Sequence, residues 1–140
     1  MQQLFKDARV VLAKAGQASA GTAVESDVID TANFEGVAFF GSIATQNATN
    51  TIKVQQGDES NLSDATDLAG TATAAGTNGN SPLIDVFRPT KRYVRAVVTR
   101  SGINTATGDI YAVLYGARKV PVAHGATIVP TFAVSPAEDD

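Results

Sequence analysis

Residues 92–100 (RYVRAVVTR) decide the fold class, because they form the clearest β-strand pattern in the chain. Val94, Ala96 and Val98 alternate with residues that face the other way, and this period of two places the three apolar side chains on one face of a strand. After a turn, residues 109–117 (DIYAVLYGA) repeat the pattern. We therefore expect these two segments to pair as a β-hairpin.

Five more short segments carry a strand signal, and turn-forming residues separate them. The first of these, EGVAFFGSIA, is apolar on both faces, which predicts a central strand. In the last one, Ile128, Phe132 and Val134 are predicted to point inward, and Pro130 marks an edge or a bulge. In residues 51–56, Ile52 and Val54 are predicted to point inward, because they alternate with polar residues. The five segments are residues 35–44, 51–56, 71–75, 82–88 and 126–134.

The first thirty residues are compatible with two structures. A helix would place five apolar side chains on one face, and Gly16 could end it. Residues 9–12, however, are rich in β-branched side chains, and residues 22–29 (TAVESDVI) have the character of a strand. We expect two strands joined by a flexible stretch at residues 13–21. The alternative helical face consists of Leu4, Ala8, Val11, Leu12 and Ala15.

The composition supports an all-β protein of about eight short strands, arranged as a sandwich or a barrel. A chain of 140 residues suits one domain over residues 1–140, which we expect to have flexible ends. Val and Thr occur 15 times each, whereas Leu occurs 6 times, which disfavours surface helices. The absence of cysteine excludes disulfides and thiolate metal sites. Because the sequence has neither a long apolar run nor a signal-peptide pattern, we expect a soluble protein made in the cytosol.

Positive charge is concentrated in one part of the chain. Residues 88–119 contain seven basic residues and one acidic residue, although the net charge of the whole chain is −3. Such a layout suits docking on an acidic protein surface, or it is cancelled by acidic loops of the same fold. Both interpretations are open at the level of sequence. If docking applies, the predicted interface residues are Arg88, Lys91, Arg92 and Arg95.

No constellation of residues predicts catalysis, so we expect the protein not to be an enzyme. General acid–base chemistry requires a histidine or a close carboxylate pair, and the single His124 lies in a turn at residues 121–125. The basic segment could also contact nucleic acid, but the acidic overall charge argues against this partner. We therefore predict no cofactor, no membrane partner and no direct nucleic-acid partner.

The loop at residues 57–70 is polar and acidic, with one helical turn expected at residues 62–68. Its carboxylates are ligands that calcium accepts, but their spacing differs from that of an EF-hand. Whether the part at residues 58–67 binds calcium stays open, and no metal site is predicted. The carboxylates belong to Asp58, Glu59, Asp64 and Asp67.

Several short phrases in the second half of the chain resemble the capsid cementing (decoration) proteins of short-tailed bacteriophages, most closely that of a Bordetella phage. The resemblance extends from about Asp27 to the end of the sequence and includes no catalytic signature. The phrases are IKVQQGD (52–58), NLSD (61–64), DVFRP (85–89), KRYVR (91–95), YGARK (115–119), PV (121–122) and HGA (124–126).

This resemblance implies a jelly-roll domain on the outer face of an icosahedral capsid, assembled in the host cytoplasm. The protein would bridge neighbouring major capsid subunits as a homodimer and would be a structural component of the virion. A second interpretation is a glycan- or receptor-binding β-sandwich module of a phage tail or fibre. Such sites stack exposed aromatic rings on sugars, and this chain has three Tyr and no Trp.

Overall fold

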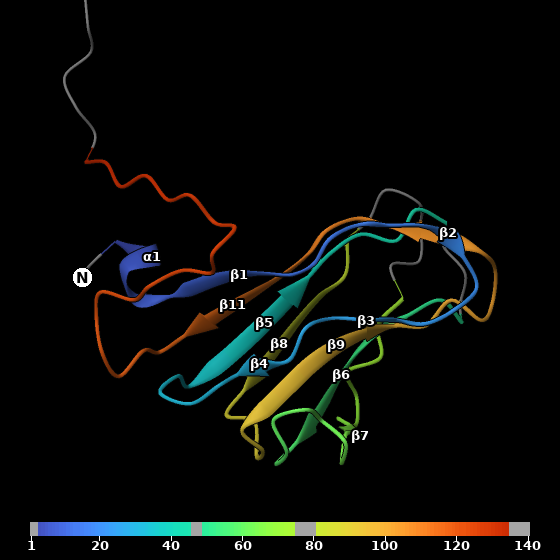
Figure 1. Ribbon diagram of the computed structural model, residues 1–140, viewed down its shortest axis with the longest axis horizontal. Helices are drawn as coiled ribbons and strands as arrows, with labels where there is room; N and C mark the ends of the chain where they lie inside the picture. The colour runs from blue at the N-terminus through green and yellow to red at the C-terminus, as the bar shows by residue number, and fades with distance from the viewer. Residues whose placement is uncertain (1–2, 46–48, 75–80, 135–140) are drawn as a thin grey trace, which may run out of the picture.

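Antiparallel β-strands make up nearly all the regular structure of this chain (Figure 1). The computed structural model describes residues 3–45, 49–74 and 81–134. Within them the elements are α1 (Leu4–Asp7), β1 (Arg9–Lys14), β2 (Gln17–Ala20), β3 (Val24–Glu25), β4 (Ile29–Asp30), β5 (Gly36–Phe40), β6 (Ile52–Gly57), β7 (Thr66–Asp67), β8 (Leu83–Phe87), β9 (Tyr93–Val98), β10 (Thr105–Thr107) and β11 (Ile110–Tyr115).

The first sheet has four strands in the order β1-β11-β5-β8. As the sequence predicts, β5 is an interior strand, because both of its neighbours pair with it along its whole length. Its Val37 and Phe39 are fully buried, and Ala38 and Phe40 face away from the core. Strand β8 lies at one edge of this sheet, directly after Pro82, which cannot donate a backbone hydrogen bond.

The second sheet is built on the pair of β9 with β6, and β7 continues it beyond β6. The short strands β3 and β4 both pair with the other side of β9. The predicted hairpin of residues 92–100 with residues 109–117 is therefore wrong, because β9 and β11 belong to different sheets. Both strands show the expected alternation, but each satisfies its hydrogen bonds with strands that are distant in sequence.

The core lies between the two sheets. Phe39 and Leu114 from the first sheet pack in one cluster with Val54, Val94 and Ala96 from the second, and all five are at most 1% exposed. The inward positions predicted for β6 and β9 are confirmed. The all-β sandwich is therefore confirmed, and the chain crosses between the sheets in an order consistent with the predicted jelly roll.

A two-stranded arm of β2 and β10 extends one end of the sandwich (Figure 1). It corrects the expectation of a flexible stretch at residues 13–21, since β2 forms there. Arg100 is 5% exposed and donates hydrogen bonds to the backbone oxygens of Ala18, Thr22 and Thr105. The buried guanidinium of Arg100 thus forms the hydrogen bonds to the arm that the small side chains of the arm cannot form.

At the opposite end, α1 lies beside the last described residues of the chain (Figure 1). Residues 126–134 form no strand, so the predicted final strand is wrong. Val129 and Val134 are 92% and 84% exposed, and the segment is held to the N-terminal region by isolated hydrogen bonds, such as Gln3 to the Ala133 oxygen. The expected turn of helix at residues 62–68 is also wrong, because Leu62 has a positive φ of 54° and β7 follows it.

Two predictions lie outside the described residues, in whole or in part. Asn78-Gly79 predicts a turn, because both residues tolerate a positive φ, and it lies outside the described residues. Of the predicted strand at 71–75, residues 71–74 are described, and Thr73 forms a bridge with Ile52. In the described part of the chain, no helix is both long and apolar enough to cross a membrane.

Candidate interaction surfaces

Three of the four basic residues predicted to form an interface pair with acidic groups of the same chain. Lys91 Nζ lies 2.8 Å from Asp58 Oδ2, and Arg95 Nη1 lies 3.2 Å from Glu25 Oε2. For these pairs the structure favours internal charge cancellation over an open basic surface. Such exposed pairs add little stability, but they leave little charge for a partner.

Arg92 forms the best-defined of these pairs, with Asp30 at the end of β4. Its Nε and Nη2 donate to the two carboxylate oxygens at 2.9 and 2.8 Å, which is the two-pronged geometry that a guanidinium favours. These hydrogen bonds hold the pKa of Asp30 below its usual value of 3.8. The pair fastens the loop before β9 to the neighbouring strand β4.

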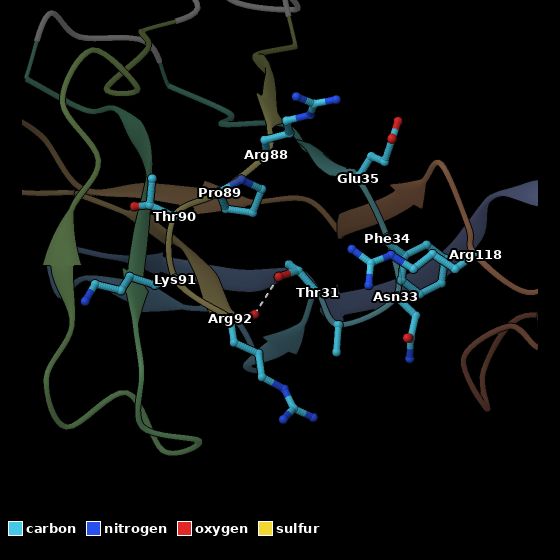
Figure 2. A pocket seen from close by; sticks show the side chains of 11 residues that line it. Thr31, Asn33, Phe34, Glu35, Arg88, Pro89, Thr90, Lys91, Arg92 and Arg118 are labelled. Carbon is cyan, nitrogen blue, oxygen red and sulfur yellow. Dashed lines mark hydrogen bonds between the residues drawn. The ribbon is translucent and has the colours of Figure 1, made fainter.

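Arg88 differs from the other three predicted residues because it forms no ion pair within the described residues. It follows β8 with a positive φ of 52°, and its guanidinium lies over the ring of Phe87 at 5.0 Å from the ring centre. Together with Arg118 it lines a cavity of about 540 Å³ between the loops at residues 31–35 and 88–92 (Figure 2). The sequence prediction did not include Arg118.

The outward side of the first sheet carries several large apolar side chains, in two groups with Asp85 of β8 between them. The strand register places Tyr111 beside Phe40 and Phe40 beside Leu83, and the rings of the first two stack at 5.6 Å. Leu83 is 64% exposed and Phe87 is 58% exposed. We call this surface the outer apolar face; its members are Phe40, Leu83, Phe87, Tyr111 and Tyr115.

An exposed apolar patch of this kind marks an interaction site more often than chance, whereas single exposed apolar residues carry no such meaning. The period of two in β5, β8 and β11 could have indicated the face, since each strand has a second apolar side. Sequence reasoning missed it because the adjacency of these strands is a tertiary property.

Tyr115 is fixed on this face by two neighbours. Its ring covers Gly36 on β5, where any Cβ would overlap the ring, and its hydroxyl donates a hydrogen bond to Asp85 on β8. Burial, together with the nearby carboxylate, raises the pKa of Tyr115 to about 12. The Tyr115 side chain is therefore ordered before any partner binds.

The acidic loop is organised by its own backbone. Asp64 accepts hydrogen bonds from the backbone N–H groups of Asp58 and Glu59, and these bonds lower the pKa of Asp64. Asp67 instead accepts from Lys53 and Gln55. Among the described residues, no group of three or more potential ligands is placed to hold a metal ion.

His124 joins the two terminal segments. Its Nδ1 accepts a hydrogen bond from the backbone N–H of Val10 at 2.9 Å, so Nε2 carries the proton and donates to the Phe5 oxygen at 2.8 Å. Both ring nitrogens are therefore used in structural contacts. This arrangement agrees with the sequence interpretation of His124 as a loop residue.

Comparisons with known proteins find a likeness among solved structures alone. No protein-family model and no curated protein matches the chain. Among solved structures, the crystal structure of SPBc2 prophage-derived protein YomS is similar, with a TM-score of 0.49 and 15% identity over 77% of this chain and 92% of that one. At this level of similarity the likeness says nothing about function, and the resemblance to capsid cementing proteins stays a prediction.

Proposed function

We propose that this protein is a non-enzymatic structural component of a phage virion, which binds the outer surface of the icosahedral capsid and cements neighbouring major capsid subunits. The observation that carries the proposal is the outer apolar face, which is exposed and on which Tyr115 is held in place by its neighbours. It offers a docking surface for protein, and the sandwich behind it is a rigid support. The resemblance of the sequence to cementing proteins supplies the identity of the partner.

The contribution of this face can be worked from exposure. Full burial of a Leu or Phe side chain contributes about 1.5–3 kcal/mol. Leu83 and Phe87 are 64% and 58% exposed. Covering both would therefore add about 2–4 kcal/mol to docking, which is roughly 30- to 1000-fold in the dissociation constant.

Cementing does not require tight binding by one copy. A protein that contacts two subunits at once, or that binds as a homodimer, gains from effective concentration. Because it would bind the assembled shell and not the loose subunits, mass action would favour the intact particle. Many copies would then resist the outward pressure of packaged DNA.

The test is co-sedimentation of the purified protein with DNA-filled capsids that lack it. We expect saturation at a fixed ratio to capsid subunits, and a higher temperature of DNA release in saturated particles. The variant Leu83→Glu with Phe87→Glu should lose binding. The matched control is Ile103→Glu with Val129→Glu, which adds the same charge at two apolar residues that are 47% and 92% exposed but lie outside the face.

Each outcome separates one interpretation from another. A few copies per particle would indicate a portal, tail or fibre component instead of a cement. No binding to capsids, together with glycan-dependent binding to host cells, would support the alternative receptor-binding module. Equal binding by the double variant and the control would exclude the outer apolar face as the contact.

A further inference from the structure

Four basic residues gather at the end of the sandwich around Asn33 and Phe34. None of them forms an ion pair with another residue in the described ranges, in contrast to Lys91 and Arg92 nearby. We call this surface the basic end; it consists of Arg9, Arg88, Arg118 and Lys119. It adjoins the outer apolar face at Phe87, over whose ring the Arg88 guanidinium lies, but its proposed role does not depend on capsid binding.

Two cavities bring the four residues together. The first, of about 540 Å³, is lined by Arg88 and Arg118, and the second, of about 230 Å³, by Arg9 and Lys119. Asn33 and Phe34 line both cavities, so the two are neighbours. Figure 2 shows the guanidinium of Arg118 beside Phe34 and directed toward the middle of the first cavity.

Backbone hydrogen bonds hold the loops of the basic end in place. The N–H of Arg118 donates to the oxygen of Asn33 at 2.9 Å, and the N–H of Arg88 donates to the oxygen of Glu35 at 2.7 Å. Both basic loops are thus anchored to the same segment. The backbones of the two basic loops are fixed before a ligand arrives, which lowers the entropy cost of binding. In Figure 2 the Arg118 side chain reaches toward the middle of the cavity, whereas the Arg88 side chain lies at its rim and is directed away from Arg118.

Arg9 adds an unsatisfied donor to this uncompensated charge. Its Nε is buried and has no hydrogen-bond partner. A buried donor without an acceptor is unfavourable, and so is the proximity of several like charges. An anionic ligand would relieve at least the second of these costs.

The shape and composition of the basic end favour carboxylates of a protein over the phosphates of a nucleic acid. A guanidinium matches a carboxylate with two parallel hydrogen bonds, and the cavities have the size of a few side chains. Glu35 also lines the first cavity and offsets part of its positive charge. The chain as a whole is acidic, with a net charge of −3, whereas nucleic-acid binding favours a basic domain.

We propose that the basic end binds an acidic peptide segment of a partner protein, with its carboxylates on Arg118 and Arg88 and on the adjacent Arg9 and Lys119. Phe34 supplies an apolar wall for the methylene groups of the glutamate side chains. The four charges give the site its affinity, and the two cavities limit it to a short, extended segment.

The test measures fluorescence anisotropy of a labelled hexaglutamate peptide with the full chain. We expect saturable binding that weakens as salt rises from 20 to 200 mM, because charges at the surface are screened. The variant Arg88→Gln with Arg118→Gln should weaken binding by about tenfold or more, since it removes two charge-assisted contacts. The control Lys14→Gln with Lys53→Gln removes the same charge elsewhere and should change binding less than about twofold.

A labelled hexaglutamine peptide and an oligothymidylate of six nucleotides complete the experiment. The proposal would be overturned if the Arg88/Arg118 variant and the control bound hexaglutamate equally well, because binding would then depend on the overall charge of the protein and not on these two residues. Tighter binding of the oligothymidylate than of hexaglutamate would overturn it in favour of nucleic acid. Absence of hexaglutamate binding at 20 mM salt would also overturn it, whatever the result of the capsid experiment.

Discussion

Replacement of Arg100 by methionine should detach the β2–β10 arm from the sandwich. The guanidinium is 5% exposed and binds three backbone oxygens, those of Thr22, Ala18 and Thr105, from three separate segments. Methionine extends as far as the Nε position of arginine, so the packing of the aliphatic part would largely remain. The substitution therefore isolates the hydrogen bonds from the loss of volume.

The expected loss can be derived from these contacts. A hydrogen bond to a charged group contributes about 1.5–3 kcal/mol, and a buried acceptor left without a donor costs about 1–3 kcal/mol. Water can reach the oxygens of Thr22 and Ala18, whose bonds are only part-buried, whereas the bond to Thr105 is buried. We expect a decrease of about 3 kcal/mol in the free energy of unfolding, or roughly 10 °C in the melting temperature.

Urea unfolding followed by circular dichroism measures this loss. The midpoint should fall while the slope with urea stays unchanged, because the same surface is exposed on unfolding. Amide hydrogen exchange should accelerate first at residues 17–20 and 105–107. The control Arg118→Met, at an exposed position, should change stability by less than about 0.5 kcal/mol. A loss below about 1 kcal/mol for Arg100→Met would refute the reasoning that these bonds hold the arm.

Three further predictions concern the core, an ion pair and the outer apolar face. Phe39→Ala should cost about 3–5 kcal/mol in urea unfolding, because Phe39 is fully buried between the sheets. The hydrogen bonds with Arg92 lower the pKa of Asp30, so the stability that ionised Asp30 gives the fold is complete above about pH 4 and is lost as the pH falls below it. Asp30→Asn should therefore lower the melting temperature at pH 6. The difference in melting temperature between this variant and the unchanged protein should vanish near pH 2. The pKa of Tyr115 is raised from 10.0 to about 12, so the stability of the fold should decrease as the pH rises through that range. Asp85→Asn should lower the pKa of Tyr115, which is measured by absorbance at 295 nm. An unchanged titration in that variant would contradict the role given to Asp85.

Much of the sandwich could be predicted from local pattern. The alternation in residues 51–56 and 92–100 correctly assigned Val54 and Val94 to the core, because a strand puts successive side chains on opposite faces whatever its partner is. The same rule failed at residues 126–134. Alternation there has no sheet to join, since the backbone hydrogen bond that reaches the end strand β1 comes from Gly125, before this segment begins.

The pairing of charges on the candidate surfaces could be predicted less well, because it depends on which residues meet in space. Lys91, Arg92 and Arg95 belong to a basic segment, but their acidic partners lie far away in sequence. The unpaired charge resides instead on Arg88 and on Arg118, thirty residues later. Net charge along the chain can show an imbalance, but it cannot show which charges meet.

The sequence by itself determined the all-β class, the inward face of most strands and the lack of cysteine chemistry, because these depend on residue type and short-range period. Only the tertiary structure decided which strands pair, and with them the outer apolar face and the basic end. Backbone hydrogen bonding is nearly the same for every strand, so pairing is selected by the fit of the whole core. Leu83, Phe40 and Tyr111 become one surface only after that selection.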